Sequence, residues 1–127
     1  MFLVPTRLAQ SSIHGLGVFA VEPIAKGAPV WRFAKGLDME FEPDLVETLP
    51  VHVRQFFAHY GYLDRYLKRV VLCFDDARFV NHSAEPNVAT DYALDPYGLD
   101  VALRDIEVGE ELTVDYGTFE EQAGREL

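Results

Sequence analysis

Short apolar runs, several of them alternating with polar residues, dominate the pattern of hydrophobic and polar positions along the chain. Glycine and proline interrupt these runs at intervals that suit small sheets. The pattern predicts strands at residues 17–21, 29–33, 69–74, 87–92, 99–104 and 111–116. Because each run is brief, the sequence predicts a mainly β fold, of the β-rich α+β type, built from several short curled sheets.

The pattern changes between residues 42 and 62. The run Glu42-Pro43-Asp44 suits the start of a helical turn, because proline is favoured at the first helical position. The apolar side chains that follow recur at spacings of three and four residues, as on one face of a helix: Val53, Phe56, Phe57 and Tyr60. We therefore expect a helical insert of one or two helices at about residues 42–62.

The two ends of the chain carry weaker signals. Residues 1–5 are apolar without a basic segment or a long apolar segment, which indicates an edge strand rather than a signal peptide. Residues 95–98, Asp-Pro-Tyr-Gly, predict a turn between two strands. The acidic tail at 118–127 predicts a short helix that Thr118 caps, with Glu121 three residues later.

Composition indicates one globular domain spanning residues 1–127, with its core at about 6–117. Hydrophobic residues make up 49% and charged residues 25%, a balance that supports a buried core. The single Cys73 lies in an apolar run, which favours a small buried hydrophobe over a reactive thiol. One cysteine cannot build an intrachain disulfide framework, so we expect an intracellular location, cytoplasmic, or nuclear if the source is eukaryotic or viral. No stretch approaches the roughly 20 apolar residues of a membrane span, so no membrane partner is expected.

The formal net charge of −10 argues against direct nucleic-acid binding, because phosphate neutralisation needs clustered lysine and arginine. It favours a basic partner. The acidic residues concentrate in two groups: Asp38, Glu40, Glu42, Asp44 and Glu47, and then Glu107, Glu110, Glu111, Glu120, Glu121 and Glu126. They are interpreted either as solvated faces that maintain solubility or as a field that attracts a lysine-rich substrate.

Two segments near the C-terminus concentrate the candidate chemistry. Residues 78–87 read Arg-Phe-Val-Asn-His-Ser-Ala-Glu-Pro-Asn, which places an amide, an imidazole, a hydroxyl and a second amide around a proline turn. Residues 109–117 read Gly-Glu-Glu-Leu-Thr-Val-Asp-Tyr-Gly, so that a phenol ends a strand where the backbone turns. Polar side chains without a structural role are unusual at such points, which makes both segments candidates for a functional site.

The two segments resemble signatures of the SET-domain protein lysine methyltransferases, which run approximately R-F-x-N-H-S-C-x-P-N and G-E-E-L-T-x-D-Y. They occur here in the same order. A third element of that family, a G-x-G near the N-terminus followed by an apolar stretch and K-G, is similar to Gly15-Leu16-Gly17 with Lys26-Gly27 downstream. The resemblance covers roughly residues 6–117.

The resemblance implies S-adenosylmethionine as cofactor and a cleft made by Gly15, Leu16, Gly17, Asn81, His82 and Tyr116. In the family the glycine loop holds the cofactor through main-chain groups, and the final tyrosine lies beside the transferring methyl, which implies Tyr116 as the catalytic residue. The substrate channel is expected at Tyr60, Tyr62 and Val114. The resemblance also implies that the segments with Asn81 and with Tyr116 lie side by side in a knot-like arrangement.

Methyl transfer to lysine makes this set of residues intelligible. The amine must be neutral, although free lysine has a pKa of about 10.4, so an apolar channel is useful. Sulfonium, methyl and amine must lie in line, which makes orientation the main contribution. The Asn81 carboxamide can accept from an ammonium and donate to a carboxylate, as the amino-acid end of the cofactor demands. The implied substrate is a lysine in a basic protein or peptide.

The chain departs from the family pattern at two places. Ala84 replaces the usual cysteine, and the tail holds none of the zinc-binding cysteines that follow the domain in many eukaryotic members. Four histidines without ligand spacing and one cysteine predict no metal site. The similarity to small viral and bacterial members implies a homodimer. A module with this fold that no longer catalyses, and that holds basic partners on an acidic surface, is the alternative function.

Overall fold

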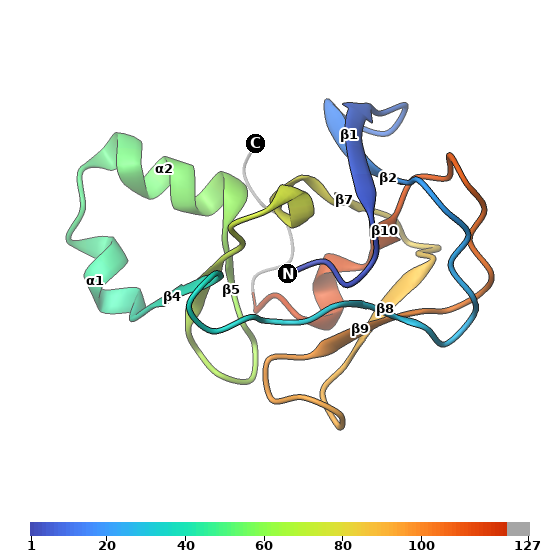
Figure 1. Ribbon diagram of the computed structural model, residues 1–127. Helices are drawn as coiled ribbons and strands as arrows, with labels where there is room; N and C mark the ends of the chain where they lie inside the picture. Colours follow the sequence, from blue (N-terminus) through green and yellow to red (C-terminus); the bar gives the residue numbers. More distant parts are fainter. Residues whose placement is uncertain (122–127) are drawn as a thin grey trace.

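Strands of two to five residues carry most of the regular structure (Figure 1). The computed structural model describes residues 1–121. Its strands are β1 (Thr6–Gln10), β2 (Leu16–Ala20), β3 (Pro29–Trp31), β4 (Met39–Phe41), β5 (Tyr62–Leu63), β6 (Val70–Leu72), β7 (Asn81–His82), β8 (Val88–Asp91), β9 (Leu99–Ala102) and β10 (Thr113–Val114). Its helices are α1 (Pro43–Glu47) and α2 (Val51–Tyr60), with short 3-10 helices η1 (Asp76–Phe79) and η2 (Tyr116–Thr118). Each predicted strand overlaps an observed one, and the predicted mainly β class is confirmed.

The strands pair into small separate sheets. Strands β1 and β2 form an antiparallel hairpin, β9 lies between β3 and β8, and β6 lies between β4 and β5. The hairpin between β8 and β9 closes through the predicted turn, where the Gly98 N–H donates to the Asp95 carbonyl at 2.8 Å. Gly98 has a φ of +86°, a conformation that glycine adopts without strain.

Strands β7 and β10 form a parallel pair, although they lie about thirty residues apart in the chain. Asn81 is opposite Thr113, and His82 is opposite Val114. The Ser83 N–H extends this ladder by donating to the Val114 carbonyl at 2.9 Å. The two segments singled out in the sequence therefore lie side by side, as expected.

Two apolar clusters hold the sheets together. The larger consists of Val18, Ala20, Ile24, Val30, Val88, Ala102, Ile106, Leu112 and Val114. The smaller consists of Trp31, Phe33, Val71 and Cys73. Burial raises the pKa of the Cys73 thiol, which keeps this thiol protonated and makes it part of the apolar packing. The smaller cluster joins β3 to β6, two strands of different sheets.

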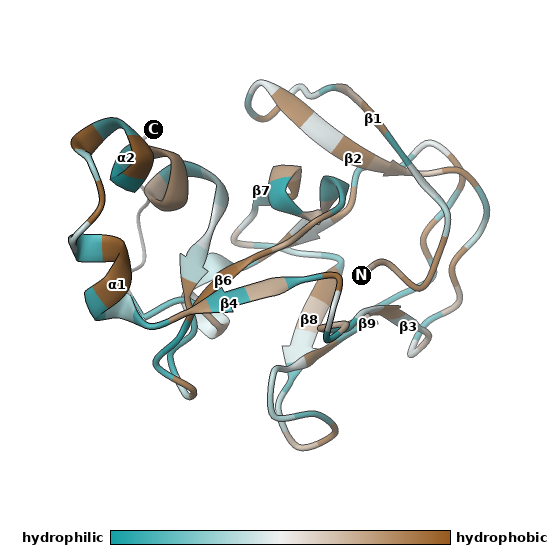
Figure 2. Ribbon diagram, turned by 60° about the vertical axis from the view of Figure 1, so that its left-hand side comes forward, coloured by the Kyte–Doolittle hydropathy of each residue, from teal (hydrophilic) through white to brown (hydrophobic). Residues whose placement is uncertain are grey.

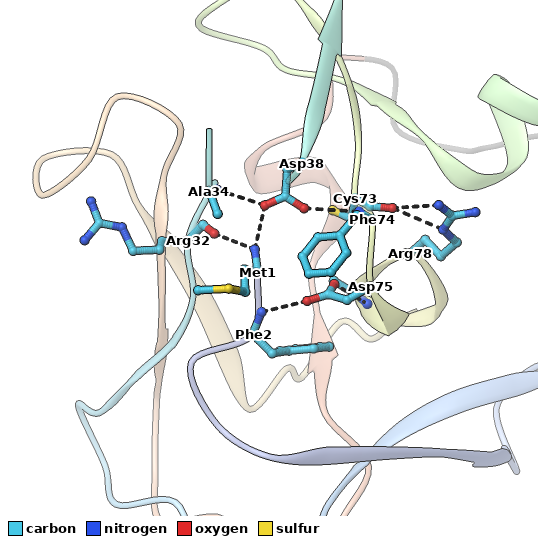
Figure 3. A network of polar contacts seen from close by, with 10 residues as sticks. Met1, Phe2, Arg32, Ala34, Asp38, Cys73, Phe74, Asp75 and Arg78 are labelled. Atoms are coloured by element: carbon cyan, nitrogen blue, oxygen red, sulfur yellow. Dashed lines mark hydrogen bonds and ion pairs between the residues drawn. The ribbon is translucent and has the colours of Figure 1, made fainter. Parts of the chain in front are cut away.

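A buried carboxylate ties the start of the chain to strands β4 and β6 (Figure 3). Asp38, whose side chain is 0% exposed, accepts from the Ala34 N–H at 2.8 Å and from the Phe74 N–H at 3.1 Å. It also accepts from the α-ammonium of Met1 at 2.7 Å. Because a buried acceptor needs such donors, Asp38 fixes three segments that are distant in sequence. It is therefore not part of an acidic surface.

Asp75 makes a second tie of this kind (Figure 3). One of its oxygens accepts from the Phe2 N–H at 2.8 Å, and the other accepts from the Ala77 N–H at 3.1 Å. The second bond caps η1, because it satisfies an N–H that the helix itself cannot pair. Asp75 thus positions η1, the element that leads into β7.

The predicted helical insert is confirmed as α1 and α2, which lie together to one side of the sheets (Figure 1). Neither helix contains a fully buried residue. Figure 2 shows apolar residues on both helices, and Leu45, Val51 and Phe56 are exposed. The insert contacts the rest of the chain through aromatic pairs, Phe57 with Phe41 and Tyr60 with Phe79.

Both ends of the chain differ from the sequence prediction. The strand near the N-terminus is β1, and within residues 1–5 Phe2 forms an isolated bridge to Trp31. Thr118 is the last residue of η2 rather than an N-cap, because Asp115 caps that helix by accepting from the Gly117 N–H. The rest of the predicted tail helix lies outside the described residues. Strands β1, β4, β5 and β7 were not predicted, and the last three have only two or three residues, which carry too little pattern.

Replacing Asp38 with alanine should lower the free energy of unfolding by about 3 kcal/mol, because two backbone N–H groups would lose their acceptor in a buried site. Urea unfolding followed by circular dichroism measures this change. Asp44→Ala is the matched control, since Asp44 is exposed and should cost less than about 0.5 kcal/mol. Equal costs for the two variants would show that Asp38 does not stabilise the fold.

Candidate active site

The parallel pair of β7 and β10 brings the predicted site residues Asn81, His82 and Tyr116 together. Tyr116 follows β10 after one residue, and its N–H donates to His82 Nδ1 at 3.0 Å. The two rings lie 5.2 Å apart between centroids. The His82 imidazole therefore accepts a hydrogen bond, which sets the start of η2 against β7.

The Tyr116 phenol has a fixed place. Its hydroxyl donates to the Val80 carbonyl at 2.6 Å, directly before β7. Asp115 makes the chain turn at this point, because its side chain caps η2 through the Gly117 N–H at 2.9 Å. Contacts from both predicted segments, residues 78–87 and 109–117, therefore hold the half-buried ring in place.

The glycine loop lies against β7. The Asn81 side-chain Nδ2 donates to the carbonyls of His14 and Leu16 at 3.0 and 3.1 Å, and to Glu111 Oε2 at 2.9 Å. Gly15, with a φ of +46°, makes the turn into β2 and leaves open space around its Cα. The structure therefore brings the loop with Gly15, Leu16 and Gly17 to the same place as Asn81.

Glu111 is a site residue that the sequence analysis did not single out. Its carboxylate accepts from Ser11 Oγ at 2.7 and 3.0 Å and from Asn81 Nδ2. A Cβ at Gly17 would overlap Glu111 Oε2. The bare Cα of Gly17 therefore gives room to Glu111. That the loop with Gly17 also holds a cofactor through main-chain groups stays a prediction. Glu111 was within reach of prediction, since it belongs to the second segment that carries the family resemblance, residues 109–117.

The orientation of the Asn81 amide follows from its partners. Three acceptors share Nδ2, so Oδ1 must point away from them. Among residues 1–121, no hydrogen bond reaches Oδ1, although the residue is only 8% exposed. The amide was expected both to donate and to accept at a ligand. The structure leaves only the accepting oxygen for that purpose.

The predicted channel residues share one cavity. Tyr60, Tyr62 and Val114 line it together with Tyr116. Its wall is largely aromatic and aliphatic, and burial is the main cause that raises the pKa of Tyr62 well above its ordinary value. Tyr116 thus belongs both to the β7–β10 pair and to the wall of the cavity.

Arg78, the first residue of the first segment, holds the insert against this cavity. Its Nε and Nη2 donate to the Cys73 carbonyl at 3.2 and 2.8 Å. Its guanidinium lies 5.8 Å from the ring centroids of both Phe56 and Tyr60 on α2. Such contacts attract a cation to the ring face, so Arg78 positions Tyr60 at the cavity.

Asp100, on β9, is a second residue that the sequence analysis missed. It lines the same cavity and accepts from Thr90 Oγ1 at 2.7 Å. Burial raises the pKa of its carboxyl to about 7, although the Thr90 bond acts in the opposite direction. The signal was an aspartate inside the apolar run Leu99-Asp100-Val101-Ala102.

Within residues 1–121, no three His, Cys, Asp or Glu side chains lie close enough to hold a metal ion. In the same part of the chain, no helix combines the length and the apolar character needed to cross a membrane.

Comparison with known families decides the relationship that the two segments indicated. The SET-domain family profile matches residues 15–117, which include the glycine loop and both segments. The chain belongs to the SET-domain family. The resemblance stated from the sequence is confirmed.

Curated relatives of this SET domain are longer proteins. It is 32% identical over 139 residues to a Candida albicans protein named histone-lysine N-methyltransferase, H3 lysine-4 specific, with 96% of this chain and 12% of that protein covered. It is 33% identical over 120 residues to the Danio rerio N-lysine methyltransferase KMT5A-A, covering 81% of this chain and 32% of that protein. The chain therefore spans less than a third of either relative.

Solved structures support the fold. The SET domain protein DIM-5 of Neurospora, a histone lysine methyltransferase, matches with a TM-score of 0.62 at 23% identity. The match covers 91% of this SET domain and 53% of that chain. The predicted SET fold of short sheets is thereby confirmed.

Gly17→Ala should lower the free energy of unfolding by about 2 kcal/mol, because the added methyl group would overlap Glu111 in a packed site. In a Glu111→Ala background the same change should cost at least 1 kcal/mol less. Chemical unfolding of the four proteins of this double-mutant cycle measures the difference. Additive costs would show that Gly17 and Glu111 are not coupled.

Proposed function

We propose that the chain is an S-adenosylmethionine-dependent methyltransferase that acts on the ε-amine of lysine in a basic protein. The observation that carries the proposal is that Tyr116 belongs both to the polar site and to the wall of the cavity. This residue contacts His82 at the polar site, and it also lines the cavity with Tyr60, Tyr62 and Val114. Methyl transfer needs one point where a polar cofactor site meets an apolar lysine channel.

The residues of the polar site fit the amino-acid end of the cofactor. The remaining Asn81 oxygen is an acceptor for an ammonium group, at a position where no protein donor uses it among residues 1–121. Gly15, Leu16 and Gly17 supply main-chain groups, and His82 supplies backbone and packing contacts. When bound, the cofactor supplies a methyl group on a sulfonium centre. The protein's part is to hold that centre in line with the amine.

Tyr116 is proposed as the catalytic residue. Its hydroxyl is oriented by donation to the Val80 carbonyl, so the phenol oxygen keeps one position while the methyl group passes. The cavity walls disfavour a charged amine, because desolvation lowers the pKa of an ammonium group. Tyr62 stays a neutral phenol there, since burial raises its pKa. Val114 completes the channel, at a position where many family members carry an aromatic residue.

A histone H3 tail is the first substrate to test. The formal charge of −10 favours a basic partner, and the Candida relative is named for lysine 4 of H3. Part of that charge lies inside the fold, however, since Asp38 and Glu120 are 4% and 5% exposed. Because histone H3 is the proposed substrate, the proposed location is nuclear. The homodimer implied by the resemblance stays a prediction.

Binding of S-adenosylmethionine separates the enzyme from the alternative, a silent module that holds basic partners. Isothermal titration should give a micromolar Kd, and Asn81→Ala should raise this Kd at least tenfold, because the variant removes a hydrogen bond to a charged group. Ser83→Ala, at the residue directly after β7, is the control and should change the Kd less than twofold. No binding by folded wild-type protein would favour the silent module.

Tyr116→Phe should lower kcat at least 100-fold while the Kd for S-adenosylmethionine changes less than threefold. The variant removes the oriented oxygen and one hydrogen bond to Val80 but keeps the ring packing. Transfer of a labelled methyl group to a histone H3 tail peptide measures the rate. Tyr66→Phe, at an exposed tyrosine, is the matched control. Equal rates for both variants would remove Tyr116 from the mechanism.

A further inference from the structure

The cavity contains one carboxyl group, that of Asp100, among the residues that the structure describes. Asp100 lies directly opposite Thr90 in the β8–β9 ladder, and Thr90 Oγ1 donates to its Oδ1 at 2.7 Å. No hydrogen bond or ion pair within residues 1–121 reaches Oδ2. One carboxyl oxygen therefore has no protein partner on the wall that also carries Tyr116.

The position of Asp100 is costly for the fold. Side chains alternate between the faces of a strand, so Asp100 points to the same side of β9 as Ala102, a residue of the larger core cluster. Burying a carboxyl there without a cation disfavours folding. Arg78, the cationic residue of the same wall, is already bound to the Cys73 carbonyl. Thr90 pairs one carboxyl oxygen of Asp100, but within residues 1–121 no cation forms an ion pair with the other.

The chemistry of the wall fits an incoming organic cation. Tyr62, Trp31 and Tyr97 are among the aromatic residues that line the cavity with Asp100. Aromatic faces attract alkylammonium groups, and a carboxylate supplies the opposite charge.

We propose that Asp100 binds the side-chain ammonium of the substrate lysine and takes up its proton before methyl transfer. This inference rests on the proposed function. The N–H bond of the ammonium breaks and its electron pair stays on nitrogen, while the proton forms an O–H bond with the Asp100 carboxylate. The neutral amine then attacks the methyl carbon as the carbon–sulfur bond breaks. Asp100 returns its proton to water when the methylated product leaves.

Two properties favour proton transfer from the ammonium to Asp100. An apolar cavity disfavours both members of an ion pair, so it favours the neutral amine with the neutral carboxylic acid. A general base also works best when its pKa lies near the working pH, and burial holds the pKa of Asp100 at about 7. An unburied aspartate, whose pKa is about 3.9, would be a much weaker base.

Other titratable groups surround Asp100. Those that interact with it electrostatically are Tyr62, Cys73, Tyr92 and the α-ammonium of Met1, and those that share its cavity wall are Tyr60, Arg78, Tyr97 and Tyr116. Burial is the main cause that raises the pKa of Tyr62, Cys73 and Tyr92. Asp64, which faces Tyr62 and Tyr92, accepts from the Tyr92 hydroxyl and from two backbone N–H groups. Because these groups lie close to Asp100, its own carboxyl signal is the one to follow.

A binding experiment tests the proposal without a protein substrate. Butylammonium chloride mimics the lysine side chain and is titrated into wild-type protein while the carboxyl signal of Asp100 is followed by carbon-13 NMR. Backbone amide signals of β9 report binding in the variants. Asp100→Asn should weaken butylammonium at least tenfold, whereas Asp91→Asn, on the paired strand β8, should match wild type. An unmoved Asp100 signal, or equal affinity in Asp100→Asn, would overturn the proposal.

Single-turnover transfer to a histone H3 tail peptide, at saturating S-adenosylmethionine, gives the second readout. The wild-type rate should rise as pH increases through about 7, because the deprotonated carboxylate is the active form. Asp100→Asn should be at least tenfold slower at pH 7 and should recover near pH 10, where free amine is abundant. A wild-type profile in Asp100→Asn would overturn the proposal. Failure of wild-type protein to bind S-adenosylmethionine would instead contradict the proposed function, and the butylammonium result would still decide on Asp100.

Discussion

The parallel pairing of β7 with β10 is the constraint on which the site depends. Each strand has two residues, which is too short to be stable without help, and the segments come from distant parts of the chain. Side chains supply that help. Asn87 donates to the Glu111 carbonyl at 2.8 Å and accepts from the Thr113 N–H at 2.8 Å. It thereby binds the first residue of β10 and a residue just before this strand. The site therefore rests on side-chain amides as much as on the backbone ladder.

The two asparagines of the first segment show how structural and functional polarity can be told apart. Asn87 is 3% exposed, and both ends of its amide have protein partners. Asn81 is nearly as buried, yet only its Nδ2 is used among the described residues. The Asn81 side-chain oxygen therefore has no protein partner within residues 1–121, which makes it available to a ligand. Both residues are asparagines of the same sequence segment, so the sequence does not distinguish them. Their hydrogen-bond partners in the structure do.

Much of the fold could be predicted from the sequence. The apolar runs predicted most of the strands, although not the five-residue β1, and they predicted the helical insert, because local periodicity reports on which face is buried. The roles of Asp38, Glu111 and Asp100 could not be predicted, because each depends on donors or walls supplied by distant segments. The same limit applies to the acidic residues. Asp38 and Glu120 belong to the groups that were interpreted as a solvated face or an attracting field, yet both are buried, so a count of charges does not describe the surface.

Tyr116 lies where two opposite demands on the protein meet. A cofactor site needs polar atoms at fixed positions, and the Asn81 amide is fixed by Glu111 and by the glycine loop. A lysine channel needs walls that keep water from the amine, and the cavity is lined largely by aromatic and aliphatic side chains. The Tyr116 hydroxyl is held by the Val80 carbonyl on the β7 side, while its ring faces the cavity. One phenol thus joins the two environments. In the proposed reaction the Asp100 carboxyl, the one carboxyl of the cavity wall within residues 1–121, accepts the proton that the amine must lose.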